Sequence, residues 1–337
     1  MESHFHLLEP LLPRVRKPLQ YVGGEVGSVV KPWGEDVTTV RWALMYPDAY
    51  EVGLPNQGLQ ILYEVLNKQP DTIAERSYAV LPDLEALLRE HGVPQLTVDS
   101  HRPVAAFDVL GVSFATELGY TNLLTALDLS GIPLHAENRD DHHPVVLAGG
   151  HAAFNPEPVA DFIDAAVLGD GEEIVTAVTE VVRAWKRDGR PGGREELLAR
   201  LASGGGVYVP RFYDVTYAAD ATLATVRPNR AGVPERVHKH TVANLDAWPY
   251  PAKPLVPLAE TVHERYSVEI FRGCTRGCRF CQAGMIYRPV RERSPEAIEE
   301  AVESSVRCGG FDEVSLTSLS TADYSAIQPL VKQVMPK

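Results

Sequence analysis

The chain has 337 residues, of which 45% are hydrophobic and 23% charged, and 45 acidic against 32 basic side chains give a formal net charge of −13. These proportions are those of a globular protein with a buried core, so they exclude a disordered chain, a collagen-like chain and a small disulfide-stapled domain. With no run of ~20 apolar residues and no basic start typical of a signal peptide, the sequence predicts a soluble, cytoplasmic protein of about two domains and no membrane partner. The acidic charge argues against a protein whose main task is to coat nucleic acid.

After an N-terminal extension over residues 1–39, residues 40–187 are predicted to alternate buried strands with helices. The apolar runs expected to form strands are 40–45, 78–81, 96–98, 109–114, 145–148 and 165–168. Apolar residues at helical spacing predict helices near 59–66 and 174–185. Strict alternation implies βαβ units, so we predict a doubly wound α/β domain over 40–187.

The turns after these strands are the predicted ligand site of this domain, because doubly wound sheets bind ligands at the carboxyl ends of their strands. Ser113 and Thr116 follow one strand, and Gly149 and Gly150 follow the next. Glycine lets a backbone approach a ligand closely, and small hydroxyl side chains can hydrogen-bond to it. An ordinary tight turn with a helix cap is the alternative for each of them, and it stays open here.

Residues 188–261 are predicted to be a bridging segment that becomes a proline-rich linker. Residues 262–337 begin a new unit, with a strand at 266–271, a helix that starts at Ser294-Pro295 and a second strand at 313–317. This order is the start of a (β/α) barrel. Since a complete barrel takes about 250 residues, we expect the chain to be truncated inside it.

Three of the four cysteines lie close together, at Cys274, Cys278 and Cys281, in the spacing C-x3-C-x2-C. Such clustering indicates a reducing compartment and a metal rather than a disulfide framework. Three thiolates can hold three irons of a [4Fe–4S] cluster, which leaves the fourth iron without a protein ligand. Three arginines are expected to offset the negative charge of such a cluster: Arg272, Arg276 and Arg279.

Zinc is the alternative metal, with Cys308 as the fourth ligand. Structural zinc sites usually come as paired C-x2–4-C knuckles, which this loop lacks. In this alternative the protein is a zinc-stabilised anion- or RNA-binding module without catalytic activity. The arginines that would hold the anion are Arg272, Arg276, Arg279, Arg288, Arg291 and Arg293.

The cysteine-bearing stretch 269–284, continued through 287–294, resembles the radical S-adenosylmethionine superfamily. More narrowly, the chain resembles a branch of that superfamily that carries an N-terminal cobalamin-binding-like domain. The elements that match this branch are Gly149-Gly150, Asn155-Pro156-Glu157-Pro158 and Gly169-Asp170-Gly171-Glu172-Glu173. The resemblance covers nearly the whole chain.

The resemblance implies that the three cysteines hold a [4Fe–4S] cluster whose open iron binds S-adenosylmethionine. An electron that reaches the cluster from an external donor would cleave S-adenosylmethionine to a 5′-deoxyadenosyl radical, for hydrogen abstraction or methyl transfer on an unknown substrate. By similarity, Ser318 and Ser320 lie where the superfamily's second strand contacts S-adenosylmethionine, although the acidic Gly-Gly-Glu form often found there is missing.

For cobalamin, the resemblance implies a groove lined by Ser113, Thr116, Gly149 and Gly150. Proteins that hold cobalamin with a histidine under the cobalt carry Asp-x-His-x-x-Gly, whereas Asp48-Ala49-Tyr50-Glu51-Val52-Gly53 has Tyr50 in the histidine position. A protonated phenol is a poor cobalt ligand. Two expectations follow: either cobalamin binds without a lower histidine ligand, or the domain has kept its fold and lost the cofactor.

Overall fold

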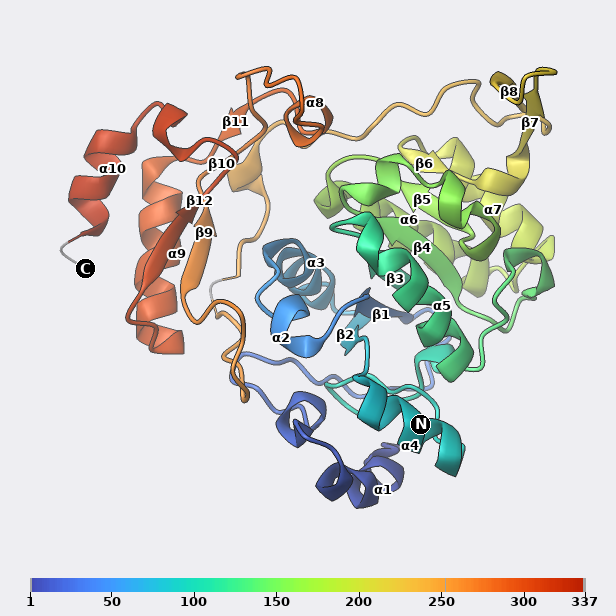
Figure 1. Ribbon diagram of the computed structural model, residues 1–337, viewed down its shortest axis with the longest axis horizontal. Coiled ribbons are helices and arrows are strands. Elements are labelled where there is room, and N and C mark those ends of the chain that lie inside the picture. The colour runs from blue at the N-terminus through green and yellow to red at the C-terminus, as the bar shows by residue number, and fades with distance from the viewer. Residues whose placement is uncertain (1, 252, 336–337) are drawn as a thin grey trace.

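The computed structural model describes residues 2–251 and 253–335, so residues 1, 252, 336 and 337 of the predicted domains lie outside the description. Two α/β parts lie beside each other (Figure 1). The larger part is built on a six-stranded sheet, and the smaller part carries the cysteines and the C-terminal helices.

The six-stranded sheet has the order β2-β1-β3-β4-β5-β6, and its neighbours are parallel except for the pair β5–β6. The residue ranges of its strands are Val40–Tyr46 (β1), Thr72–Tyr78 (β2), Val109–Ser113 (β3), Val145–Gly149 (β4), Ala165–Val167 (β5) and Val207–Tyr208 (β6). This is the doubly wound architecture that the alternating pattern predicted.

Helices cover both faces of this sheet, which is why its central strands are apolar on both sides. Trp42 and Leu44 of β1 join the core with α3 (Gln57–Asn67), α6 (Gly171–Arg187) and α7 (Gly193–Ser203). Ala43 and Met45 of the same strand join the opposite core with α5 (Tyr120–Leu129). The N-terminal extension, with α1 (Phe5–Leu8) and the short 3-10 helix Glu9–Arg14, packs on α4 (Pro82–His91).

Two of the predicted strands are wrong. The second strand is Thr72–Tyr78 rather than 78–81, and residues 96–98 contribute only an isolated bridge, from Leu96 to Pro103. The strand β2 was missed because it contains two charged residues, Glu75 and Arg76, which are nevertheless fully buried. Their charges are paired inside the protein: Arg76 lies 2.7 Å from Asp99 and 2.9 Å from Glu25, and Glu75 lies 2.7 Å from Arg102.

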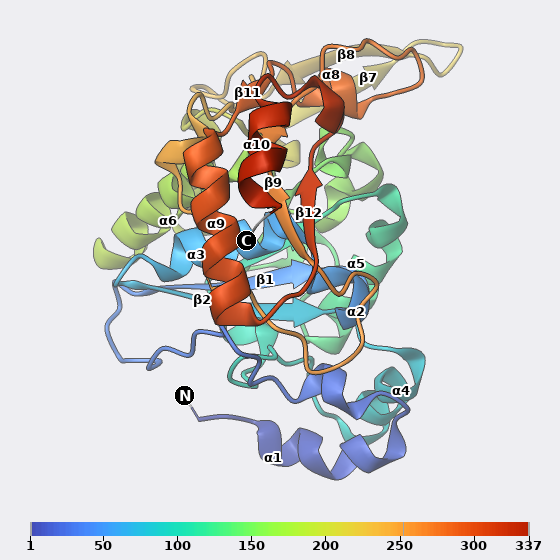
Figure 2. The same cartoon turned by 90° about the vertical axis from the view of Figure 1, so that its left-hand side faces the viewer.

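The smaller part is a βαβα unit, with β9 (Tyr266–Glu269) parallel to β12 (Val314–Thr317) and α9 (Pro295–Gly309) and α10 (Ile327–Val334) packed on one side (Figure 2). Ser294 caps α9 as predicted, with its Oγ accepting from the amide of Ala297 at 3.2 Å. Gly310 ends the same helix in the left-handed conformation. Across residues 253–335 these strands form no closed barrel.

Between the two parts the chain first stays with the sheet. Helix α7 and strand β6 lie in the segment predicted as a bridge, and both pack on the larger part. The hairpin of β7 (Tyr213–Tyr217) and β8 (Leu223–Pro228) projects at one end of the molecule, and the chain then crosses to the smaller part (Figure 1). The domain boundaries themselves stay a prediction. None of the described helices is long and apolar enough to cross a membrane.

Candidate active site

A cavity of about 720 Å³ lies between the carboxyl ends of the sheet strands and the smaller part. Its floor is apolar and is formed by Trp42 and Leu44 of β1, Ile61 and Leu62 of α3, and neighbouring strand residues. The smaller part contributes the opposite wall: Phe271, Arg272, Gly273, Ala283, Tyr287 and Ser318. The cavity is therefore lined by segments, such as β1 and β10, that lie more than 200 residues apart in the sequence.

The predicted groove residues meet at this cavity. Ser113, Thr116, Gly149 and Gly150 all line it from the sheet side. Gly150 has a φ of +91°, and a Cβ there would lie 2.7 Å from the carbonyl oxygen of Phe114, so this position requires glycine. A Cβ at Gly149 would meet no atom within 4 Å, so this position is open toward the cavity.

The two serines predicted to contact S-adenosylmethionine lie in different surroundings. Ser318 lines the cavity, and its hydroxyl lies 2.9 Å from that of Thr321. Ser320 is not among the described residues that line the cavity, and its hydroxyl donates to Asp323 at 2.7 Å. Both assignments stay predictions, with Ser318 the better placed.

Tyr50, in the position of the cobalt-ligating histidine, is turned away from the cavity. It lies in the short helix α2 (Tyr50–Gly53), its side chain is buried, and its hydroxyl accepts a hydrogen bond from the amide of Leu258 at 3.3 Å. Burial raises the pKa of this phenol, so it stays protonated. Of the described residues that line the cavity, none belongs to the run 48–53.

The cysteines lie on a hairpin, here called the cysteine hairpin, which spans residues 271–292. Strand β10 (Phe271–Arg272) pairs antiparallel with β11 (Arg291–Glu292), and the loop between them contains the short helix α8 (Ala283–Ile286). Gly273 has a φ of +94°, and a Cβ there would lie 2.5 Å from the carbonyl oxygen of Pro289. The two ends of the loop thus approach backbone to backbone, which only glycine permits.

Cys274 and Cys281 are half-buried, Cys278 is exposed, and all three are free thiols. The amide of Arg276 lies 3.5 Å from the Cys274 sulfur, and the amide of Gly284 lies 3.4 Å from the Cys281 sulfur. Amide contacts to sulfur are among the interactions that stabilise and tune iron–sulfur clusters. Three thiols on one loop, two of them met by backbone amides, therefore fit a cluster.

Across residues 2–251 and 253–335, no three histidine, cysteine or carboxylate side chains form a group that could hold one metal ion. The thiolates of a [4Fe–4S] cluster bind separate irons and need not converge on one point. Cys308, the fourth ligand of the zinc alternative, is exposed near the end of α9.

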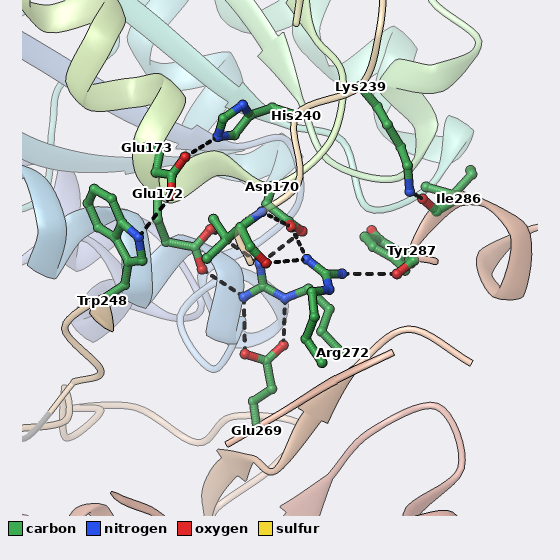
Figure 3. A network of polar contacts seen from close by, with 12 residues as sticks. Asp170, Glu172, Glu173, Lys239, His240, Trp248, Glu269, Arg272, Ile286 and Tyr287 are labelled. Carbon is green, nitrogen blue, oxygen red and sulfur yellow. Dashed lines mark hydrogen bonds and ion pairs between the residues drawn. The ribbon is translucent and has the colours of Figure 1, made fainter. Parts of the chain in front are cut away.

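A network of charged side chains joins the cysteine hairpin to the larger part (Figure 3). Arg272, directly before Gly273, lies 2.9 Å from Glu269, 2.7 Å from Glu172 and 2.9 Å from Asp170. Burial disfavours charge on Arg272, but the carboxylates outweigh it and raise its pKa. Burial alone would raise the pKa of Asp170. The positive charges of Arg272 and Arg291 together have the larger, opposite effect, so the pKa of Asp170 lies below its ordinary value.

The arginines expected to offset the charge of a cluster have partners within the protein. Arg272 pairs with carboxylates of the protein, and Arg276 pairs with Asp323. Compensation of the cluster charge by these arginines stays a prediction. Arg291 and Arg293 are also buried and ion-paired. Arg276 and Arg279 are exposed and Arg288 is half-buried, so the arginines do not form one group, and metal analysis has to decide between the cluster and the zinc-stabilised module.

The bridging segment adds a second connection between the two parts. The ammonium group of Lys239 donates to the carbonyl oxygens of Ile286 and Arg288 on the cysteine hairpin. The next residue, His240, lies 2.5 Å from Glu173 of α6 (Figure 3). Sequence reasoning missed these contacts. The turn Gly169–Glu173 and the arginines were both visible in the sequence, but nothing local indicates that they meet.

The fold and the site define the class of protein: a doubly wound α/β part and a βαβα part, with a three-cysteine loop beside a cavity between them. Two family models match the chain, "Radical SAM proteins, N-terminal" over residues 58–210 and "Radical SAM superfamily" over residues 268–337. The chain belongs to the radical S-adenosylmethionine superfamily, in the branch with this N-terminal part.

The chain is also similar to two known proteins. An uncharacterized protein of Methanocaldococcus jannaschii is 22% identical over 292 residues, which cover 86% of this chain and 51% of the relative. The chain thus spans about half the length of this curated relative. A solved structure of the cobalamin-dependent S-adenosylmethionine radical enzyme OxsB, with aqua-cobalamin and S-adenosylmethionine bound, shares the fold with a TM-score of 0.50 and 14% identity. That match covers 89% of this chain and 37% of OxsB.

Proposed function

We propose that this chain binds a [4Fe–4S] cluster through Cys274, Cys278 and Cys281 and cleaves S-adenosylmethionine reductively. The observation that carries the proposal is the position of the cysteine hairpin: Gly273 and Ala283, which flank the three cysteines, both line the cavity. A cluster on these thiolates would border a space large enough for a cosubstrate and a substrate.

When bound, such a cluster supplies one electron from an external donor, which breaks a carbon–sulfur bond of S-adenosylmethionine to give methionine and a 5′-deoxyadenosyl radical. The radical would serve hydrogen abstraction or methyl transfer on a substrate that remains unknown. The protein's own residues orient and shield the site. Amides of the hairpin face two of the sulfurs, and buried Phe271 helps to exclude water from the cavity wall.

Cobalamin is the second ligand that we propose for this cavity. The apolar floor, the open position at Gly149 and the hydroxyls of Ser113 and Thr116 suit a large flat ring that has apolar faces and polar groups at its edges. The cobalamin bound by the structural neighbour OxsB adds support. Because Tyr50 is buried elsewhere, we expect cobalamin to bind without a lower ligand from the run 48–53 that replaces Asp-x-His-x-x-Gly.

The test is anaerobic reconstitution of the chain with iron and sulfide, followed by iron and sulfide analysis. The wild-type protein and Cys308→Ser are expected to take up the same cluster, and Cys274→Ser is expected to lose it. Failure of the wild-type protein to form a cluster would refute the proposal, and one zinc without sulfide would favour the zinc-stabilised module.

A second measurement tests the chemistry. Reductant and S-adenosylmethionine are added to the reconstituted protein, and release of 5′-deoxyadenosine is expected. A stable cluster without this product would restrict the function of this chain to cluster binding.

A further inference from the structure

The two strands that close the cysteine hairpin place two arginines opposite each other. Arg272 of β10 and Arg291 of β11 are direct cross-strand partners. Like charges at opposed positions destabilise a strand pair. Each of these strands has only two residues, so the ladder offers few backbone hydrogen bonds to offset the repulsion.

Both arginines turn to one carboxylate of the larger part. One Asp170 oxygen lies 2.9 Å from Arg272, and the other contacts Arg291. Asp170 and Arg291 are buried and Arg272 is largely covered, with exposed side-chain fractions of 4% for Asp170, 7% for Arg291 and 13% for Arg272. The amide of Val242 donates to the same carboxylate at 2.8 Å and fixes its orientation.

Two other carboxylates lie nearby, and each of them contacts Arg272 but not Arg291. Glu172 and Glu269 contact Arg272 (Figure 3). Among the ion pairs of the described residues, Asp170 alone joins Arg272 and Arg291. Asp170 occupies the N-cap position of α6, in the turn after β5, and lines the cavity, so its backbone belongs to the larger part and not to the hairpin.

We propose that Asp170 is the positioning residue of the cysteine hairpin: its carboxylate neutralises the opposed arginines and holds the three cysteines at the mouth of the cavity. The contacts of Asp170 with the two arginines do not depend on any cofactor. Their effect on the stability of a bound cluster rests on the proposed function. The neutral side chain of Asp170→Asn keeps the size of the residue but takes the carboxylate from buried Arg291, which then faces Arg272 with only Glu172 and Glu269 to offset the two positive charges.

The first experiment needs no cofactor. Amide hydrogen exchange is measured on the full chain without a cluster, for the peptides that cover residues 273–290. We expect Asp170→Asn to raise the exchange rate of these peptides about tenfold or more, because an uncompensated buried charge is costly. Asp128→Asn, which breaks an exposed ion pair with Arg89, is the matched control and should leave their exchange within about twofold of wild type.

A double-mutant cycle separates neutralisation of the arginines from a merely structural role. If Asp170 acts by neutralising both arginines, Asp170→Asn will accelerate exchange much less in an Arg291→Gln background than in the wild type, because the repulsion is already gone. Equal acceleration in both backgrounds, or no acceleration in either, would overturn the inference. Should Asp170→Asn fold poorly, Asp170→Glu keeps the charge, and its exchange is expected to lie between those of wild type and Asp170→Asn.

The cluster gives the second readout. After reconstitution, a ferrous chelator is expected to remove iron from Asp170→Asn about tenfold faster than from wild type, and the electron paramagnetic resonance spectrum of the reduced cluster is expected to change. An unchanged spectrum and rate would refute the positioning role. If wild type takes up no cluster, the proposed function fails, and the exchange experiment still decides the role of Asp170.

Discussion

The adjacent glycines at the end of β4 offer a test that separates the ligand site from the fold. A leucine at Gly149 would extend into open space beside the cavity, because its Cβ would meet no atom within 4 Å. A methyl group at Gly150 would lie 2.7 Å from the carbonyl oxygen of Phe114, on a backbone with a φ of +91°. Two neighbouring substitutions therefore have opposite expected consequences.

The magnitudes follow from this geometry. At Gly150→Ala the left-handed backbone costs about 1–2 kcal/mol. The clash with Phe114 adds about 1–3 kcal/mol, as overpacking does. Gly149→Leu has neither cost, so its free energy of unfolding should stay within about 0.5 kcal/mol of wild type.

For cobalamin binding, the substitution at Gly149 should have the large effect that Gly150→Ala has on stability. Gly149→Leu fills part of the cavity, and we expect it to weaken binding of hydroxocobalamin by about 100-fold, or ~2.7 kcal/mol. Chemical denaturation gives the stabilities, and equilibrium dialysis gives the affinities. Unchanged affinity of Gly149→Leu would refute the assignment of the cavity as the cobalamin site. Equal loss of stability in the two variants would refute the geometric distinction between the glycines.

Three further predictions concern the fold and its charges. Ser294→Ala removes the cap of α9 and should lower the free energy of unfolding by about 1 kcal/mol, measured by chemical denaturation. Asp164→Asn leaves two buried arginine partners without their carboxylate and should cost about 3–5 kcal/mol, whereas a cost near that of the exposed Asp128→Asn would contradict this. The pKa of Asp170 lies below its ordinary value of 3.8, and that of Glu269, which is buried but held ionised mainly by Arg272, lies below its ordinary value of 4.5. Their stabilising effect is therefore complete above these ordinary values and is lost as the pH falls through the lower folded values, so acid unfolding should be shallower in Asp170→Asn than in wild type.

The sequence by itself determined most of the regular elements of the larger part and predicted the chemistry of the cysteine loop. Apolar runs located β1, β3, β4 and β5, because strands buried on both faces have no polar alternation. The Ser294-Pro295 start and the glycine end located α9, because caps act within a few residues. The prediction from sequence failed at β2, where the charged residues Glu75 and Arg76 are buried. Their ion-pair partners lie elsewhere in the chain, at Arg102, Asp99 and Glu25, so the local sequence does not show that the charges are paired.

Only the tertiary structure decided where the cysteine loop lies and what its arginines do. Arg272 was visible as a basic residue beside three cysteines, and Asp170 as an acid in a strand-to-helix turn, about 100 residues earlier. Local patterns cannot show that these side chains meet, because the contact depends on how the chain crosses from the sheet to the smaller part. The same crossing creates the cavity, with Gly149 on one wall and Gly273 on the other.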